Sequence, residues 1–264
     1  MTDTPLISVI MPAYNTANFI AEAIDSVIQQ TWSHWELIII DDASTDATVE
    51  VINSYTTCDP RVQLIQNKRN KGPGVSRNLG IEKANGTFIA FLDSDDQWLP
   101  YKLKTQVEFM HQNNLDMSFS SYYLLKENEE QPYAVVQAPE VLTYSKLLRS
   151  NYVGNLTGMY DVTKTGTVFA PSIRKRQDWA LWLTILKNKG ETRSILQPLA
   201  VYRVRKESLS QNKTALIAYN YRIYRDFLHF GLLKSYAFMS LFLWEHFIVK
   251  SRQIKLLDKG SKLF

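Results

Sequence analysis

Three carboxylates follow a short apolar run near the middle of the chain. The run from Phe88 to Leu92 is typical of a strand buried on both faces of a parallel sheet, and Asp93, Asp95 and Asp96 follow it. Crowded carboxylates repel one another. A Mg²⁺ or Mn²⁺ ion relieves that repulsion, because such an ion takes one or two protein carboxylates and completes its shell from substrate phosphates. The alternative is a solvated acidic turn in which Ser94 or Asp96 caps the following helix.

Four strand-then-helix units in the first 113 residues would position these carboxylates. Apolar, β-rich runs at 6–11, 35–40, 62–66 and 88–92 are each followed by a segment with helical periodicity. This alternation predicts an α/β fold, a doubly wound, mostly parallel, Rossmann-like sheet with flanking helices. Because the carboxyl ends of parallel strands meet at one edge, the turns at Tyr14, Asp42 and Asp93 should line one cleft.

Composition excludes several classes of protein. The chain has 264 residues and 45% hydrophobic content, enough for one large or two small globular domains. The single cysteine, Cys58, excludes an intramolecular disulfide and is typical of a reducing cytosol. The N-terminus lacks the basic region of a signal peptide, and no uncharged apolar run reaches the length of a transmembrane helix. We therefore expect a cytoplasmic location.

The pattern changes after a helix that ends near residue 113. Strands are predicted at 117–125, 133–137, 156–160 and 199–204, and an amphipathic helix at 177–187. We expect one domain over residues 1–210, divided near Asn114 into a sheet half (1–113) and a second half (114–210). Residues 211–264 would form a basic, aromatic, helical extension.

This C-terminal extension has two interpretations. From Val201 onward the chain holds 12 Lys and Arg residues against 4 Asp and Glu residues, a local balance of +8. The aromatic stretch from Tyr236 to Val249 is too short to span a bilayer, but it suits a helix that lies on an anionic membrane surface. Packing against the domain, with a solvated basic end, is the alternative. The basic residues after this stretch are Lys250, Arg252, Lys255, Lys259 and Lys262.

The turns at the sheet edge favour a nucleoside diphosphate as ligand. The first strand-to-helix turn contains no G-x-G-x-x-G, so NAD or FAD binding in the usual manner is not expected. Gly72-Pro-Gly74 lacks the Lys-Ser/Thr ending of a P-loop and is not a Walker motif. Tyr14 could stack on a base or simply pack. Asp42 could accept a hydrogen bond from a base or ribose, and a metal at the acidic turn could bind the diphosphate.

Four motifs between residues 12 and 96 resemble those of the family-2 glycosyltransferases of the GT-A fold. They are Pro12-Ala-Tyr-Asn15, Asp41-Asp-x-Ser-x-Asp-x-Thr48, Asn70-x-Gly72 with Ser76-Arg-Asn-x-Gly80, and Phe91-Leu-Asp-Ser-Asp-Asp96. The similarity continues more weakly through Gln177-Asp178-Trp179 and Tyr202-Arg-Val-Arg205. There it is most like bacterial transferases that build O-antigen (lipopolysaccharide), capsule or teichuronic acid.

The resemblance implies that residues 1–113 are a nucleotide-sugar-binding half and residues 114–210 an acceptor and catalytic-base half. It also implies a role for individual residues. Asp93 and Asp95 would bind Mn²⁺ or Mg²⁺, and Asp178 would be the catalytic base. Gln177 stands where the family often has another acid, and Arg205 stands at a histidine position. The implied nucleotide-sugar site consists of Pro12, Tyr14, Asp42, Asn70, Arg77, Asp93, Ser94, Arg203 and Arg205.

The activity implied is that of an inverting hexosyltransferase. It would move a sugar from a UDP-sugar to a hydroxyl of a polyprenyl-pyrophosphate-linked saccharide and give a β-linkage. A non-catalytic sugar-nucleotide-binding or scaffold subunit is the alternative, against which the intact Asp93, Asp95 and Asp178 count. Asp178 could instead cap the helix that it begins. A phosphatase with Asp93 as nucleophile is disfavoured by Gln97, and no nucleic-acid-binding module is present.

Overall fold

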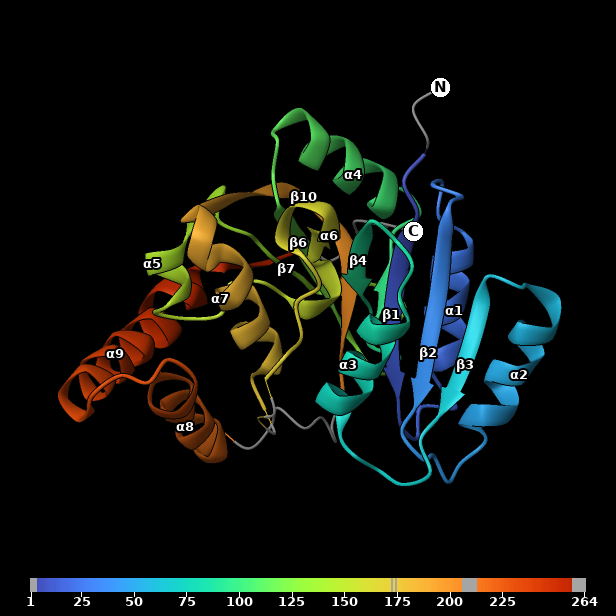
Figure 1. Cartoon of the computed structure of the whole chain (residues 1–264), viewed down its shortest axis with the longest axis horizontal. Helices are drawn as coiled ribbons and strands as arrows, with labels where there is room; N and C mark the ends of the chain where they lie inside the picture. Colours follow the sequence, from blue (N-terminus) through green and yellow to red (C-terminus); the bar gives the residue numbers. More distant parts are fainter. Residues whose placement is uncertain (1–3, 172, 174, 206–212, 258–264) are drawn as a thin grey trace.

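The computed structural model describes residues 4–171, 173, 175–205 and 213–257. Within them, eleven strands form one mixed sheet (Figure 1). Eight strands follow the order β11-β7-β6-β9-β4-β1-β2-β3, and β10 pairs with β5, β6 and β8. The strands are β1 (Ile7–Ala13), β2 (Trp35–Asp41), β3 (Val62–Gln66), β4 (Phe88–Phe91), β5 (Gln97–Trp98), β6 (Met117–Lys126), β7 (Ala134–Val136), β8 (Val141–Thr143), β9 (Met159–Asp161), β10 (Glu191–Val204) and β11 (Ile254–Leu256).

The helices connect and cover this sheet. The main ones are α1 (Ile20–Ile28), α2 (Thr48–Cys58), α3 (Pro73–Lys83), α4 (Lys102–Gln112), α7 (Gln177–Lys189), α8 (Lys213–Arg222) and α9 (Leu232–Trp244). Short turns of helix are α5 (Tyr144–Leu147), η1 (Asn155–Thr157), α6 (Val162–Thr165), η2 (Ile223–Phe227), η3 (Glu245–Val249) and η4 (Lys250–Gln253).

The N-terminal half of the sheet is parallel, as predicted. Strand β1 pairs in parallel with β2 and β4, and β2 pairs in parallel with β3. The register places Ala13 of β1 opposite Asp41 of β2, and Ile10 of β1 opposite Phe91 of β4. The turns after these three strands therefore lie at one edge of the sheet.

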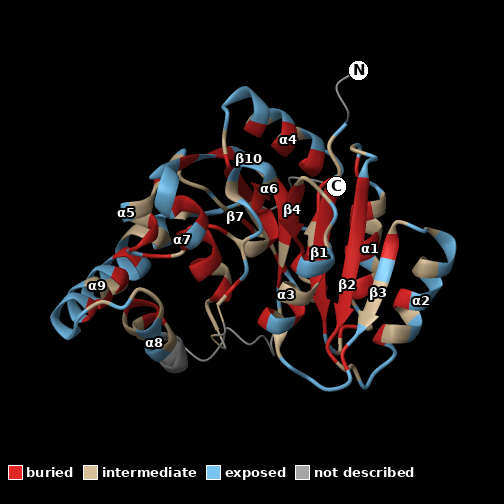
Figure 2. Cartoon of the chain, viewed as in Figure 1, coloured by how far each residue is buried: buried red, intermediate tan, exposed pale blue. Residues whose placement is uncertain are grey.

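Both faces of the parallel strands are buried, which explains their continuous apolar sequences. Alternate side chains point to opposite faces of a strand. Ile10, Ile38 and Phe91 belong to a core that α3 and α7 cover, whereas Val9 and Leu37 belong to a second core that α1 and α4 cover. In Figure 2, β1, β2 and β4 are buried along most of their length, and α2 and α9 expose their outer sides.

Beyond β4 the pairs are antiparallel except that β10 runs parallel to β6, and β10 is longer than predicted. Strand β9 pairs antiparallel with both β4 and β6 and thereby joins the two halves of the chain. Strand β10 begins at Glu191, eight residues before the predicted start at Leu199, and its pairing with β6 shifts on both sides of Pro198. Proline cannot donate a hydrogen bond to a neighbouring strand, so the sequence around Pro198 does not predict a strand.

The C-terminal segment forms a helix that packs on the domain by one side. Residues Leu232–Gln253 are helical over 22 residues and, by length and composition alone, could cross a membrane. The expectation that no segment reaches the length of a transmembrane helix is therefore wrong, because the aromatic stretch from Tyr236 to Val249 lies within this longer helix. Tyr224 and Phe242 are buried, with ring centroids 5.9 Å from Trp179 of α7. The predicted boundary at residue 210 and the basic residues Lys259 and Lys262 lie outside the described residues.

Candidate active site

The loops that follow β1 and β2 are hydrogen-bonded to each other. Asn15 and Ala43 both have positive φ angles, 51° and 65°, so each chain turns sharply at the end of its strand. The backbone N–H of Asn15 donates to Ser44 Oγ at 3.0 Å, and that of Ala17 donates to Asp46 Oδ2 at 3.1 Å. The spaced polar residues Ser44 and Asp46 therefore hold two strand-end loops side by side.

Asp42 holds the Gly-rich loop in place. Its carboxylate is 3% exposed and accepts hydrogen bonds from the backbone N–H groups of Lys71 and Gly72 and from Asn67 Nδ2, the last at 2.8 Å. Gly72 has a φ of 88°, a conformation that favours glycine. The predicted contact of Asp42 with a base or ribose stays a prediction. Among its predicted partners, Pro12 is buried in β1, whereas the ring of Tyr14 is 47% exposed.

The two candidate capping residues of the acidic turn after β4, Ser94 and Asp96, are buried, so the interpretation of this turn as a solvated cap is wrong. Ser94 is 4% and Asp96 is 1% exposed. Helix α4 has Tyr101 as its N-cap residue and receives no side-chain cap. Asp96 Oδ1 instead accepts a hydrogen bond from the backbone N–H of Arg203 at 2.9 Å. The turn is thereby fixed against β10.

Arginine residues pair with both carboxylates of the predicted metal site. Arg77 Nη2 lies 2.5 Å from Asp93 Oδ1, and Arg205 Nη1 lies 3.0 Å from Asp95 Oδ2. Arg203 Nε donates to the backbone O of Asp95 at 3.1 Å. Three of the predicted basic residues thus surround the turn, although they belong to α3, to β10 and to the residue just after β10. Asn70, in contrast, is exposed in the loop after β3.

Burial and mutual repulsion shape the charges at this turn. Desolvation and the neighbouring Asp93 raise the pKa of Asp95, against the opposing effect of Arg205. Desolvation, Asp95 and Asp93 raise the pKa of Asp96 well above its usual range. Burial opposes the charged form of Arg77, but the carboxylates of Asp93, Asp178 and Asp95 outweigh it and raise its pKa. Negative charge is therefore in excess here, and added positive charge would stabilise it.

This donor set fits a divalent cation that a substrate helps to bind. In the part of the chain that the structure describes, no group of three or more His, Cys, Asp or Glu side chains is arranged to hold a metal ion. Mg²⁺ and Mn²⁺ sites that also use substrate phosphates need only one or two carboxylates. Asp93 and Asp95, crowded and partly exposed at 31% and 27%, can supply them.

Asp178 lies in the first turn of α7 and does not cap it. The N-cap residue is Arg176, with a φ of 68° and no side-chain cap bond. The carboxylate of Asp178 accepts a hydrogen bond from Asn151 Nδ2 at 2.7 Å, while Asn151 Oδ1 accepts one from the backbone N–H of Val153 at 3.1 Å. The alternative role of Asp178 as an N-cap is therefore wrong. Its carboxylate is oriented by a side chain from another segment.

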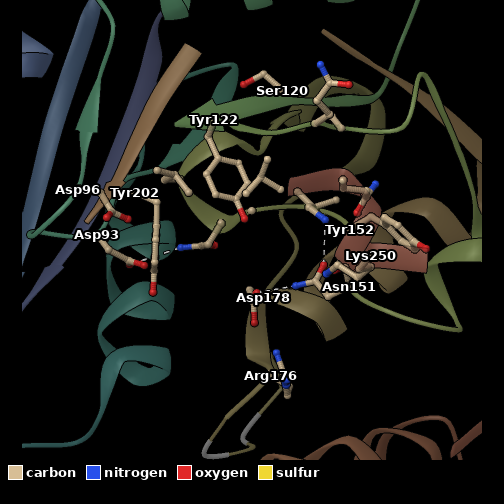
Figure 3. A pocket seen from close by; sticks show the side chains of 18 residues that line it. Asp93, Asp96, Ser120, Tyr122, Asn151, Tyr152, Arg176, Asp178, Tyr202 and Lys250 are labelled. Atoms are coloured by element: carbon tan, nitrogen blue, oxygen red, sulfur yellow. Dashed lines mark hydrogen bonds between the residues drawn. The ribbon is translucent and has the colours of Figure 1, made fainter. Parts of the chain in front are cut away.

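One cavity of about 300 Å³ joins the acidic turn to Asp178. Figure 3 shows Asp93, Asp96 and Tyr202 on one side of it and Asp178 with Asn151 on the other. A smaller cavity is lined by Arg77, Asn155 and Asp178, among others. Of the predicted site residues, Asp93 and Asp178 line the large cavity. Pro12, Tyr14, Asp42 and Asn70 belong to β1 and to the loops after β1, β2 and β3 and do not line it.

Several residues of the cavity were not predicted. Asn151 and Asn155 come from one loop, Arg176 precedes α7, and Lys250 comes from the C-terminal helix. Two asparagines four residues apart around Gly154, in an otherwise irregular segment, were the one local signal for a polar site. Lys250 was grouped with the surface cations of the extension. The structure places it in the cavity lining, with Nζ 2.5 Å from the backbone O of Asn151.

Comparison with known proteins places the chain among sugar transferases. The family described as glycosyl transferase family 2 matches residues 8–169. A Bacillus subtilis glycosyltransferase named for teichuronic acid biosynthesis, TuaG, is 40% identical over 86% of this chain and 90% of its own length. Escherichia coli WfgD, named UDP-Glc:alpha-D-GlcNAc-diphosphoundecaprenol beta-1,3-glucosyltransferase, is 34% identical over 90% of this chain and 92% of its own length.

Solved structures show the same fold. The structure of S. aureus TarS 1-349 in complex with UDP-GlcNAc superposes with a TM-score of 0.69 at 22% identity, covering 91% of this chain and 72% of that chain. Mannosyltransferase PcManGT from Pyrobaculum calidifontis, in complex with GDP-Man and Mn²⁺, superposes with a TM-score of 0.66 at 17% identity, covering 96% of this chain and 72% of that chain. The expected α/β, GT-A-like fold is confirmed.

Proposed function

The chain belongs to glycosyl transferase family 2, and on this premise we propose that it moves a sugar from a UDP-sugar to a hydroxyl of a polyprenyl-diphosphate-linked saccharide. Inversion at the anomeric carbon would turn an α-linked donor into a β-linked product. The name of WfgD supports both substrate classes, and that of TuaG supports a bacterial surface polymer as the product. UDP-glucose is the first donor to test, because WfgD is named for it.

The observation that carries this proposal is the shared cavity. Asp93, from the turn that would hold the donor diphosphate, and Asp178, the candidate base, line the same space from opposite sides. Arg77 lies near both, since its Nη2 is 2.5 Å from Asp93 Oδ1 and its side chain lines a smaller cavity together with Asp178. A donor sugar bound at the turn would therefore present its anomeric carbon to an acceptor bound next to Asp178.

The reaction we propose is a single displacement. Asp178 Oδ1 or Oδ2 takes the proton of the acceptor hydroxyl as that oxygen forms a bond to the anomeric carbon. The bond between the anomeric carbon and the diphosphate oxygen breaks on the opposite face, and UDP leaves with the electron pair. Asn151, by donating to Asp178 Oδ2, leaves Oδ1 available to the acceptor. Arg203 and Arg205 lie next to Asp95 and would interact with the departing diphosphate.

We propose Mn²⁺ or Mg²⁺ as the cofactor, held by Asp93 and Asp95. When bound there, the ion would supply positive charge beside the diphosphate. The Mn²⁺ in the complex of PcManGT supports this choice of metal. Binding would compete with Arg77 and Arg205 for the two carboxylates, so we expect these arginines to turn toward the diphosphate when the donor is bound.

Calorimetry of UDP tests the donor site directly. UDP is titrated into the wild type and into Asp95→Ala, each with Mn²⁺ and then with EDTA. We expect binding that requires Mn²⁺ in the wild type and is lost in the variant. UDP-glucose is then incubated with N-acetylglucosamine linked through a diphosphate to a short alkyl chain. Absence of UDP binding under both conditions would contradict the proposal and favour a scaffold subunit.

We also propose that the C-terminal helix contacts the cytoplasmic face of the membrane. Large apolar side chains project from it, among them Leu233 (88% exposed), Trp244 (62%) and Phe247 (62%). Lys234 and Arg252 of the same helix are exposed cations, which anionic lipids would attract. Surface contact is favoured over a span, because the opposite side of the helix is buried in the domain. A lipid-linked acceptor would be met at this surface.

A further inference from the structure

Two partly buried cations lie at the Asp178 side of the cavity. Arg176 immediately precedes α7, and Lys250 begins η4 at the end of the C-terminal helix (Figure 3). Lys250 Nζ donates to the backbone O of Asn151 at 2.5 Å. Arg176 Nε is buried and has no hydrogen-bond partner among the described residues. A guanidinium nitrogen without an acceptor at the wall of a cavity indicates that a ligand supplies one.

Two carboxylates, Asp178 and Glu245, offset the charges of this pair only in part. Burial and the neighbouring Arg176 lower the pKa of Lys250 to about 8, although Asp178 and Glu245 oppose the shift. Burial also lowers the pKa of Arg176, against the effect of Asp178. Glu245 accepts a hydrogen bond from the hydroxyl of Tyr152 at 2.5 Å, so its charge is shared with another donor. An anion bound between the two cations would relieve their repulsion.

We propose that Arg176 and Lys250 bind the diphosphate of the acceptor, and this inference rests on the proposed function. A diphosphate diester carries two negative charges, which matches two cations, and a guanidinium binds phosphate oxygens through paired donors. The amides of Gln137, Asn155 and Gln253 line the same cavity and offer donors and acceptors to the sugar. The acceptor would thus be held by its diphosphate with its sugar beside Asp178.

The position of Lys250 in the chain supports a lipid-linked ligand. Lys250 follows the exposed Phe247 by three residues in the helix Leu232–Gln253. At about 1.5 Å per residue, the cation lies roughly 5 Å farther along the helix axis than that aromatic ring. A helix whose aromatic side chains enter the lipid would therefore bring Lys250 close to the headgroup layer. The diphosphate of a membrane-anchored carrier lies in that layer.

The donor diphosphate belongs to a different set of cations. Arg203 and Arg205 lie beside Asp95 and do not line the cavity that Arg176 and Lys250 line. The two sites can be separated experimentally, because UDP occupies only the first. A carboxylate of an acidic sugar is the other possible source of negative charge for the second site.

Calorimetry in saturating UDP distinguishes these sources. The probes carry N-acetylglucosamine on a short alkyl diphosphate, the same sugar as a neutral alkyl glycoside, and glucuronic acid as an alkyl glycoside. We expect the wild type to bind the diphosphate most tightly. Lys250→Gln and Arg176→Gln should each weaken that binding about 10- to 100-fold, the value of a charge-assisted hydrogen bond, and leave the neutral glycoside unaffected.

The control is Lys187→Gln, an exposed lysine of α7 that does not line the cavity. It should bind all three probes like the wild type, and thermal melting should show that the variants are folded. Equal binding of the diphosphate by wild type and Lys250→Gln, no binding by the wild type, or tighter binding of the uronic acid would each overturn the inference. Binding of UDP and transfer to the neutral glycoside report separately on the proposed function.

Discussion

Asn151 Nδ2 donates a 2.7 Å hydrogen bond to Asp178 Oδ2, and the backbone O of the same asparagine accepts a hydrogen bond from Lys250. One residue thus contacts the candidate base through its side chain and the C-terminal helix through its backbone. These contacts join segments 27 and 99 residues apart in the sequence. The candidate base is therefore oriented by the same loop that positions the proposed acceptor site.

The first prediction concerns Asp178 as the base. Asp178→Asn keeps an oxygen that can accept the hydrogen bond of Asn151 but cannot take a proton. We expect turnover to fall by about 100-fold or more, because general base catalysis is worth at least that. Calorimetry should show unchanged binding of UDP with Mn²⁺. Turnover within about threefold of the wild type would show that Asp178 is not the base.

The second prediction tests whether Asn151 orients the carboxylate of Asp178 or only stabilises the fold. Asn151→Asp is nearly isosteric but places a second carboxylate beside Asp178. Two carboxylates this close cannot both be charged easily, so the pKa of the pair should rise. The acidic limb of the pH profile of kcat should move to higher pH by roughly one unit or more. Asn151→Ala should lower kcat with a smaller movement, because it removes one hydrogen bond but adds no charge. Identical profiles for both variants would contradict the orienting role.

A third prediction concerns Lys102, which takes no part in the site. Its side chain is 0% exposed, and its ammonium nitrogen has no hydrogen-bond partner in the described structure and lies 3.8 Å from the centroid of the Trp98 ring. Burial lowers its pKa well below the usual value. Lys102→Met should therefore raise the free energy of unfolding by about 1–3 kcal/mol.

The pH dependence of unfolding checks this explanation. Because the unfolded chain binds the proton of Lys102 more readily than the folded one, the stability of the wild type should rise with pH as the usual lysine pKa is approached. Lys102→Met should lose this contribution. Lys104→Met, on the exposed side of α4, should change the free energy of unfolding by less than about 0.5 kcal/mol. A destabilised Lys102→Met would contradict the argument.

A fourth prediction tests the membrane contact. In flotation with vesicles of anionic phospholipid, the wild type should float. The double variant Trp244→Gln/Phe247→Gln should bind the vesicles at least roughly tenfold more weakly, because it lacks the two aromatic rings that would enter the lipid. Leu196→Gln changes an apolar residue of β10 that is 54% exposed and should float like the wild type. Equal flotation of the double variant and the wild type would exclude this surface.

The parallel part of the fold was predictable because burial on both faces leaves a simple signal. The strand Trp35–Asp41 is buried at every position, and its sequence is correspondingly apolar. The acidic turn was found in the same way, as polar residues directly after such a strand. Asp178 was found through the resemblance, because a single carboxylate near a helix start has no distinctive pattern of its own.

What could not be predicted depends on contacts between distant segments. Strand β10 forms around Pro198 because β6 and β8 supply partners on either side of it, and local propensity does not report them. Lys250 belongs to a run of basic residues, and the sequence does not distinguish a lysine that faces solvent from one that faces a cavity. Only the packing of the C-terminal helix on α7 decides between these environments.

The last prediction uses the titration of Lys250. Its pKa of about 8 means that the free protein loses this charge between pH 7 and pH 9. If the charged form binds the acceptor diphosphate, the apparent Kd for the alkyl diphosphate probe should rise roughly tenfold over that range. The diphosphate diester keeps its charge throughout. Lys250→Gln should show a flat profile, and Lys187→Gln should retain the wild-type one.

The groups that face Lys250 allow a stability artefact to be excluded. They are Arg176, Asp178, Glu245 and the ring of Tyr152. Tyr152 does not titrate between pH 7 and pH 9, because burial and Glu245 raise the pKa of its hydroxyl far above that range. Because the pKa of Lys250 is lowered in the folded protein, the free energy of unfolding should rise as the pH increases from about 8 toward the usual lysine pKa. The affinity for the diphosphate should fall over the same range. Because the two quantities move in opposite directions, a loss of affinity without a loss of Tm would identify Lys250 as the titrating ligand, and a Kd independent of pH would rule it out.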